Sequence, residues 1–460
     1  MQKFLSKYAL AVHLALLLVA PLFMFPFFSV EQTATVVLWG SLFSFCWLLL
    51  EPSRRVHEYL FNARKRVLGS ILSDPLFWVA CFVLLLAFIA WVNAGVELVY
   101  GFVDNDWRWT VKTPRLSWLP GSDSVSGYAM FSQYAALVVV LQACRHALGK
   151  SARTMFVFSA ALFAGVAALA AVFSVVSGNA VASGMAFAHG PESSFAGSSF
   201  GLFFLAAVTS FSGMFERGWN RAMLLFSFAA GATFTGLWCF APPMVTFFYA
   251  AIGLLLLLVC AVYVAVCHGS LPFFKFLVAL IFAAAIPVLV VNLAVPAELA
   301  EAKSALLKME LIPEVYAGSR SLYSAIASDI WQRGNVWLGA GAGSFPLCIR
   351  LELPESGWVN WIPNGWWQLL AERGIVGLTM LVLPFCFLGF TFLSRLCNAE
   401  FRRSTWAFAL FGVLAFAAVA AEGFFNASLL RPEVLVSAGA FLAIGAASFP
   451  PRQRAAATDK

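Results

Sequence analysis

The sequence predicts an all-α, polytopic integral membrane protein with about 12 transmembrane helices. Of its 460 residues, 62% are hydrophobic and only 11% are charged, whereas soluble domains average roughly 45–50% and 25%. Phe occurs 47 times and Trp 16 times, and such bulky apolar residues are typical of surfaces that face lipid and its interfaces. This composition excludes a water-soluble globule.

Twelve apolar segments are each long enough to cross a bilayer, which takes about 20 helical residues. They lie at 8–29, 33–50, 75–96, 129–147, 155–176, 199–215, 222–238, 244–266, 276–297, 374–394, 405–424 and 433–449. The first follows a short basic stretch and reaches Val30 without a small-x-small cleavage site, so we expect a retained span rather than a cleaved signal peptide.

These segments divide the chain into four regions. Residues 1–297 hold spans 1–9, residues 298–373 form a large polar loop, residues 374–449 hold spans 10–12, and residues 450–460 form a short tail. The loop carries six Trp residues, which a disordered segment seldom holds. We therefore expect an ordered, helical outer loop between spans 9 and 10.

Two features inside the loop predict local structure. The stretch 319–332 places apolar residues on one face at helical spacing, which predicts an amphipathic helix. These residues are Leu322, Tyr323, Ile326, Ile330 and Trp331. The run Leu-Gly-Ala-Gly-Ala-Gly-Ser-Phe at 338–345 predicts a tight turn.

The charge distribution predicts the orientation of the chain. With the amino terminus inside, 19 of the 29 basic residues fall on the cytoplasmic side, and 16 of the 22 acidic residues fall outside. Cytoplasmic loops retain Lys and Arg, so we expect both termini and the 450–460 tail to be cytoplasmic. The net charge of +7 then reports orientation rather than a nucleic-acid partner.

Metal and nucleotide sites lack their usual motifs. The nine Cys form no CxxC pair, and the five His show no HExxH spacing, so we expect no metal. The glycine run 339–343 lacks the flanking strand and helix of a dinucleotide site, and no Walker loop occurs. We therefore expect no cofactor.

Any chemistry at the outer face must draw its energy from the substrate, because ATP is absent outside the cytoplasmic membrane. A lipid-linked sugar diphosphate is such a substrate, and Arg is suited to bind it because its planar fork makes paired hydrogen bonds to phosphate. The basic residues on the outer side are Arg108, Lys112, Arg115, Lys303, Lys308, Arg320, Arg333, Arg350, Arg373 and Arg431.

A longer pattern begins at Arg320 and ends at Gly377. The Arg precedes the amphipathic stretch and the glycine run, and Asn-Gly-Trp-Trp-Gln-Leu-Leu-Ala-Glu-Arg-Gly then follows at 364–374. This order resembles the O-antigen ligase and polymerase superfamily, whose pattern is Arg, then Gly-x-Gly-x-x-Phe, then His-Asn-x-Tyr-Leu-Gln-x-x-x-Glu-x-Gly opening a span. The close match covers about sixty residues.

The resemblance implies a metal-independent membrane glycosyltransferase in the bacterial cytoplasmic membrane. Its donor would be a glycan on undecaprenyl diphosphate, and its acceptor lipid A-core in a ligase, a growing glycan in a polymerase, or a protein. Arg320 would clamp the diphosphate, with Arg333 and Arg350 as further substrate-binding candidates. Asn364, Gln368 and Glu372 fall at i, i+4 and i+8 on one helical face, where they either line the site or hold the loop.

The chain departs from the family pattern at two places. Pro363 stands where the family has its histidine, and 235–243 reads Thr-Gly-Leu-Trp-Cys-Phe-Ala-Pro-Pro where the family has Ser-Arg-Gly. The base would then be His189 or Glu372, and the second cation Arg108 or Arg115. Alternatively, a diphosphate stabilised by arginine is a good enough leaving group to need no strong base.

Two other functions remain open. Twelve spans with both ends inside also describe many secondary transporters, although the chain shows no two-half repeat and few ionisable residues within spans. An inactive lipid-glycan binding protein of the same fold would explain Pro363. Glu422, near the outer end of the eleventh span, is either functional or reaches the interface beside Asn426 and Arg431.

Overall fold

The structure of the protein is a computed structural model. This structure describes residues 2–24, 30–50, 59–103, 105–112, 116, 119, 121–176, 191–216, 220–268, scattered positions in 274–285, 314–341, 343–352, 362, 364–397 and 406–447. Of these residues, 85% are helical.

The helices of the first half are α1 (Gln2–Met24), α2 (Val30–Leu50), α3 (Leu60–Leu72), α4 (Pro75–Val92), α5 (Ser124–Gln142), the π-helix η1 (Ala143–Ala147), α6 (Lys150–Val176), α8 (Pro191–Glu216), α9 (Asn220–Phe240) and α10 (Pro243–His268). The second half holds α13 (Glu314–Arg333), α14 (Ser344–Glu352), α15 (Gly365–Cys397), α16 (Trp406–Glu422), the 3₁₀ helix η3 (Ser428–Leu430) and α17 (Pro432–Ala447). Two strands, β1 (Glu97–Val103) and β2 (Asp106–Lys112), follow α4.

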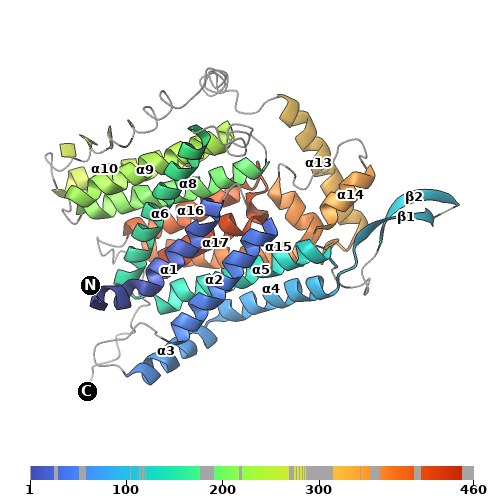
Figure 1. Cartoon of the computed structure of the whole chain (residues 1–460), viewed down its shortest axis with the longest axis horizontal. Helices are drawn as coiled ribbons and strands as arrows, with labels where there is room; N and C mark the ends of the chain where they lie inside the picture. Colours follow the sequence, from blue (N-terminus) through green and yellow to red (C-terminus); the bar gives the residue numbers. More distant parts are fainter. Residues whose placement is uncertain are drawn as a thin grey trace.

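The long helices lie side by side in one bundle (Figure 1). At one end of the bundle lie α13, α14 and the β1–β2 hairpin, and we call this the hairpin end. At the other end lies α3, and we call this the α3 end. The bundle thus separates two groups of shorter elements, an arrangement compatible with a multi-pass membrane protein.

Within the described part of the chain, six helices are long and apolar enough to cross a membrane. They are Pro75–Val92, Ser124–Ala147, Ser151–Val175, Phe195–Gly213, Ala222–Phe240 and Met244–Val262. A bent pair, Gly365–Thr379 with Leu381–Phe387, adds one more if it counts as a single span, and the shorter apolar helices are Tyr8–Phe23, Thr35–Trp47, Leu410–Glu422 and Glu433–Gly445. The mostly helical, multi-span character is as predicted, whereas the count of twelve stays a prediction.

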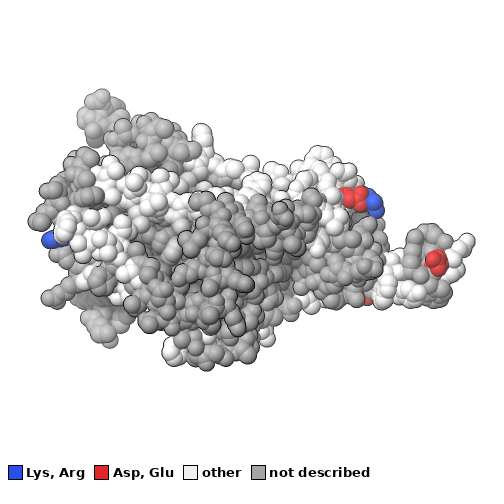
Figure 2. All heavy atoms as spheres, turned by 90° about the horizontal axis from the view of Figure 1, so that it is seen from above, with Lys and Arg blue, Asp and Glu red and all other residues white. Residues whose placement is uncertain are grey.

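The predicted segments fall on these helices with one exception. Segment 276–297 lies largely outside the described residues. Figure 2 shows that, among the described atoms on the face in view, charged side chains lie near the two ends of the long axis and the surface between them is uncharged. Large apolar side chains such as Leu254 and Leu258, 63% and 59% exposed, suit a surface that faces lipid.

The β1–β2 hairpin is the part of the described chain that the all-α prediction missed. Its strands pair antiparallel from Glu97 opposite Lys112 to Val103 opposite Asp106, and Asn105 takes a positive φ of 67° at the turn. Tyr100 and Trp109 face each other with ring centroids 5.3 Å apart, a favourable cross-strand pair. The two runs are rich in β-branched and aromatic residues, which favour strands.

A buried polar network joins the helices of the core near the hairpin end. Glu422 is 1% exposed, and its carboxylate accepts hydrogen bonds from the hydroxyl groups of Ser198 and Tyr249 and from the Asn426 amide. The Tyr249 bond is 2.9 Å and the Asn426 bond is 3.0 Å long. The interpretation that Glu422 reaches the membrane interface is therefore wrong, because its oxygens find their donors inside the bundle.

A charged cluster closes the α3 end. Asp74 caps α4 by accepting a hydrogen bond from the Leu76 N–H, and its Oδ2 lies 2.9 Å from His146 Nε2 and 3.2 Å from Arg145 Nε. Burial by itself raises the pKa of the Asp74 carboxyl, but the His146 hydrogen bond, the Arg145 charge and the Leu76 N–H together hold that pKa below its ordinary value. The ionised carboxylate thus stabilises the fold.

We expect Asp74→Asn to lower the stability of the folded protein by about 1–3 kcal/mol at neutral pH, because it removes a charge that receives three stabilising contacts. Asparagine still caps a helix, so Asp74→Ala should cost about 1 kcal/mol more. The folded-state pKa of Asp74 is depressed. The difference in the free energy of unfolding between wild type and Asp74→Asn should therefore be largest above pH ~4, and it should shrink as the pH falls through that folded-state pKa. Thermal unfolding in detergent across this pH range measures it, and a difference that grows on acidification would contradict the assignment.

Candidate functional site

The glycine loop, residues 338–343, joins α13 and α14 to the bundle at the hairpin end. Three of its residues, Gly339, Gly341 and Gly343, have positive φ values of 75°, 103° and 74°. The sequence prediction of a tight turn is therefore confirmed. The loop lies against α15 and against the start of α5, so it decides how the outer helices sit on the bundle.

Gly374 interrupts α15 and opens its backbone to the loop. Its φ of 63° and ψ of −172° lie outside the helical region, so the carbonyls before it and the N–H groups after it need other partners. The Ala340 and Gly341 N–H groups donate to the carbonyls of Ala371 and Glu372, each at 2.9 Å. The Ile375 and Val376 N–H groups donate to the carbonyls of Val336 and Trp337. The loop and the broken helix therefore pair like two short strands.

The polar stripe predicted on α15 holds this loop in place. Asn364 Oδ1 accepts the Trp367 N–H at 3.2 Å and so caps α15. Gln368, 2% exposed, accepts the Ile362 N–H at 3.2 Å and donates to Glu372 Oε1 at 3.4 Å. The Glu372 carboxylate also accepts the backbone N–H groups of Gly343 and Phe345, at the start of α14. These bonds favour the structural interpretation of the stripe, and a catalytic role for Glu372 stays a prediction.

Arg373 is a half-buried cation that has no anionic partner within the described residues. Its guanidinium lies over the Tyr134 ring, 4.6 Å from the centroid. Its Nε and Nη1 atoms are buried and make no hydrogen bond, and no ion pair joins it to an acid within the described residues. The neighbouring Glu372 carboxylate turns instead toward the glycine loop. An unpaired buried charge is costly unless something compensates it, so this guanidinium is poised for an anion.

A narrow pocket with a volume of about 40 Å³ lies beside Arg373. Helix α4 contributes Val83, Leu86, Ala87 and Ala90, helix α5 contributes Met130 and Tyr134, and the glycine loop and α15 contribute Leu338, Gly341, Glu372, Arg373 and Gly377. Mostly apolar side chains thus surround the Arg373 guanidinium, and the Glu372 carboxyl group is also part of the lining. Such a site matches a ligand with an anionic head and an apolar body.

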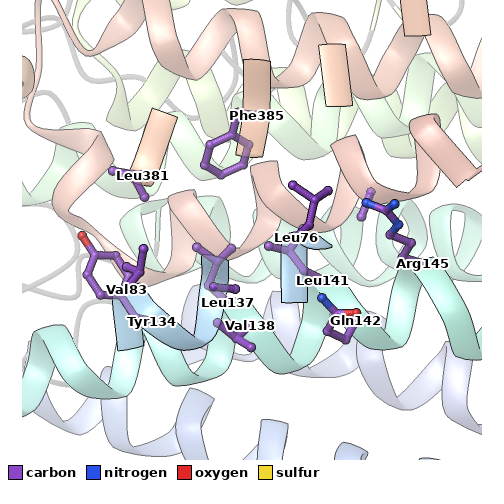
Figure 3. Close-up of a pocket in the computed structure, with 12 residues that line it drawn as sticks. Leu76, Val83, Tyr134, Leu137, Val138, Leu141, Gln142, Arg145, Leu381 and Phe385 are labelled. Carbon is purple, nitrogen blue, oxygen red and sulfur yellow. The ribbon is translucent and has the colours of Figure 1, made fainter. Parts of the chain in front are cut away.

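A second pocket continues this space along the bundle. It shares Val83 and Tyr134 with the Arg373 pocket, and its remaining walls are almost entirely apolar, including Leu137, Leu381 and Phe385. Figure 3 shows Tyr134 and Val83 at one end of this pocket and Gln142 and Arg145 at the other. The two pockets share part of their lining between α4, α5 and α15, and together we call them the lipid groove.

Of the other predicted site residues, the structure describes the side chain of Arg333 but not those of the remaining ones. Arg333 ends α13, where it pairs with Asp329 at 2.8 Å and is 71% exposed. Arg320, Arg350 and Arg108 lie in α13, α14 and β2, but their side chains are outside the described residues. His189, Arg115 and Pro363 are also outside the described residues. Their roles stay predictions.

The amphipathic face predicted for 319–332 is largely confirmed in α13. Tyr323, Ile326, Ile330 and Trp331 pack with residues of α14 and α15 in a separate small core. Leu322, by contrast, is 47% exposed. This packing lets α13 hold the glycine loop from the outside.

Arg373 is a candidate site residue that the sequence singled out only as one of the basic residues on the outer side. The available signal was its place directly before Gly374, at the entrance to a predicted span, where a charged residue is costly and tends to be functional. Comparison of the chain with models of protein families and with curated proteins finds no match.

Proposed function

We propose that this protein transfers a glycan from an undecaprenyl-diphosphate donor to an acceptor at the periplasmic face of the bacterial cytoplasmic membrane. In this proposal the chain has twelve spans, both termini are cytoplasmic, and the hairpin end with the loop 298–373 is periplasmic. The excess of basic residues in the predicted cytoplasmic segments supports this orientation.

One observation supports the proposal: the Arg373 guanidinium, whose buried Nε and Nη1 atoms have no partner among the described residues, lies in a pocket with mostly apolar walls. A lipid diphosphate supplies what this pocket lacks, because its phosphate oxygens can accept hydrogen bonds from the buried Nε and Nη1 atoms. Its polyprenyl chain is wholly apolar and fits the walls of the lipid groove. Arg320, from the family resemblance, is the proposed second cation on the diphosphate.

The transfer step uses the diphosphate as the leaving group. The acceptor hydroxyl oxygen forms a bond to the anomeric carbon as the bond from that carbon to the diphosphate oxygen breaks, and undecaprenyl diphosphate leaves with the electron pair. The hydroxyl proton passes to a base, for which His189 and Glu372 are the predicted candidates. Arginine contacts stabilise the charge that develops on the leaving group.

Reconstituted transfer tests the proposal directly. The full chain in liposomes, supplied with the host's lipid-linked glycan and an acceptor, is expected to release undecaprenyl diphosphate, which mass spectrometry detects. Donor binding without any release would indicate an inactive lipid-glycan binder. Proton- or sodium-dependent solute flux without release would indicate a secondary transporter.

Deleting the gene in its host separates the possible acceptors. Loss of polymer with single repeats persisting on lipid or core identifies a polymerase. Full-length polymer that accumulates on the lipid carrier identifies a ligase. Unchanged lipopolysaccharide, exopolysaccharide and lipid-linked intermediates would contradict both assignments.

A further inference from the structure

An open cleft lies at the hairpin end, on a different side of α5 from the glycine loop. It has a volume of about 640 Å³, within the range of pockets that hold drug-sized ligands, about 300–1,000 Å³. Helix α2 contributes Gln32, Thr35 and Val36, helix α4 contributes Trp91, and helix α5 contributes Ser124, Val125 and Tyr128. None of these residues takes part in the proposed transfer step.

The cleft is formed at helix ends, close to the edge of the bundle. Gln32 lies in the first turn of α2, Trp91 lies in the last turn of α4, and Ser124 is the first residue of α5. These ends meet at the hairpin end of the bundle (Figure 1). The cleft therefore opens where the helices leave the apolar middle of the protein, so a polar ligand can reach it.

The walls combine aromatic rings with uncharged polar groups. Trp91 packs against Phe131 with nearly parallel rings, 5.3 Å between centroids, and tilts against Tyr128 at 5.5 Å. These contacts hold the indole ring rigidly at the cleft. Tyr128 Oη accepts a hydrogen bond from Thr35 Oγ1 at 3.2 Å, so the hydrogen of the Tyr128 hydroxyl can donate to a ligand. Among the residues that the structure describes, the lining contains no Lys, Arg, Asp or Glu.

This combination fits a carbohydrate better than other ligands. The apolar C–H face of a sugar ring packs on an aromatic ring, and its hydroxyl groups exchange hydrogen bonds with hydroxyl and amide side chains. A phosphate group would require a cation, and the described lining supplies none. A lipid acyl chain would offer no hydrogen bond to the Ser124 and Tyr128 hydroxyl groups.

Helix α5 links the cleft to the diphosphate site. Its first two turns place Ser124, Val125 and Tyr128 in the cleft, while Met130 lines the Arg373 pocket. Ser126, between them in sequence, lies against the glycine loop, where a Cβ on Gly343 would come within 2.5 Å of it. A glycan in the cleft would therefore sit one helix width from the site of transfer.

We infer that the cleft between α2, α4 and α5 binds the neutral sugar rings of a glycan substrate. This inference deepens the proposed glycan transfer and rests on it for the identity of the sugar. Trp91 supplies the stacking surface, and the hydroxyl groups of Thr35, Ser124 and Tyr128, with the Gln32 amide, supply the hydrogen bonds. The cleft thus holds the sugar chain apart from the diphosphate that Arg373 binds.

A binding measurement on the full chain in nanodiscs tests the inference. The probe is a neutral oligosaccharide fraction from the host's surface polysaccharide, free of lipid and phosphate, and saturation-transfer NMR measures its contact with the protein. Wild type is expected to bind the probe. Tyr128→Phe should weaken binding about two- to tenfold, because it removes one donor and keeps the ring, and Trp91→Ala should weaken it at least as much.

Trp78→Phe provides the matched control, because Trp78 is an exposed aromatic residue of the same helix at the α3 end, 59% exposed. It should leave sugar binding unchanged. Equal sugar binding by wild type, Tyr128→Phe and Trp91→Ala would overturn the inference, as would a phospholipid recovered from the cleft by photo-crosslinking at Val125. The probe lacks diphosphate, so the two proposals can fail separately. Sugar binding in the cleft without release of undecaprenyl diphosphate would support the sugar site and contradict the transfer function. Release of undecaprenyl diphosphate without sugar binding in the cleft would support the transfer function and contradict the sugar site.

Discussion

Replacing Arg373 by alanine is expected to weaken binding of undecaprenyl diphosphate about 10- to 100-fold and to reduce glycan transfer by at least as much. Hydrogen bonds to charged groups contribute about 1.5–3 kcal/mol, and each 1.4 kcal/mol is about tenfold in affinity. The buried Nε and Nη1 atoms of Arg373 have no partner among the described residues, so a ligand anion can gain these bonds without displacing one that the structure shows. Binding is measured with the full chain in nanodiscs and labelled lipid diphosphate.

Substitution by lysine separates charge from geometry. Arg373→Lys keeps the positive charge but loses the planar fork that contacts two phosphate oxygens, so it should recover only part of the affinity. Tyr134→Phe keeps the ring beneath the guanidinium and should bind nearly as wild type. Lys112→Gln is the charge control, because Lys112 lies in the hairpin, is 58% exposed and pairs with Glu97 at 3.4 Å. It should leave diphosphate affinity unchanged.

The opposite result would be equally informative. If Arg373→Ala binds undecaprenyl diphosphate as well as wild type, the anion site is elsewhere, and Arg320 becomes the main candidate. Arg373→Ala could instead raise thermal stability without changing the affinity for undecaprenyl diphosphate. The substitution would then only have removed an unpaired charge from an apolar pocket, and Arg373 would not bind the ligand.

Local features of this chain were predictable because each depends on residues close in sequence. The apolar spacing of 319–332 predicted α13 and four of its five packed side chains, and the glycine run predicted the turn at 338–343. The i, i+4, i+8 spacing placed Asn364, Gln368 and Glu372 on one face. The sequence did not reveal that this face binds backbone groups of a loop about thirty residues earlier.

The candidate site was less predictable because it depends on which helices become neighbours. The importance of Arg373 follows from the walls that α4 and α5 place around it, and no spacing rule brings Val83 and Tyr134 to that position. The hairpin was missed because an apolar, aromatic run beside a predicted span looked like part of an interfacial loop. Glu422 was misplaced because its donors, Ser198 and Tyr249, come from helices more than a hundred residues away in sequence.

Replacing Gly341 by alanine is expected to disrupt the junction between the glycine loop and the bundle. Its φ of 103° is one that residues with a side chain rarely adopt, and such strain costs about 1–3 kcal/mol. A Cβ at this position would also lie 1.6 Å from the backbone oxygen of Gly121, so the start of α5 must move. We expect a fall in the unfolding temperature and a loss of most transfer activity.

Gly389→Ala is the matched control for this loss. Gly389 lies in α15, as Gly374 does. A Cβ added at Gly389 would meet no atom within 4 Å. Alanine is favoured over glycine inside a helix by about 1 kcal/mol, so this variant should be at least as stable as wild type and fully active. If Gly341→Ala behaves like Gly389→Ala in both unfolding and transfer, the loop does not pack on α5 as the structure places it. The Arg373 pocket would then lack the wall that Gly341 and Leu338 provide. This result would weaken the proposal that the pocket binds a diphosphate.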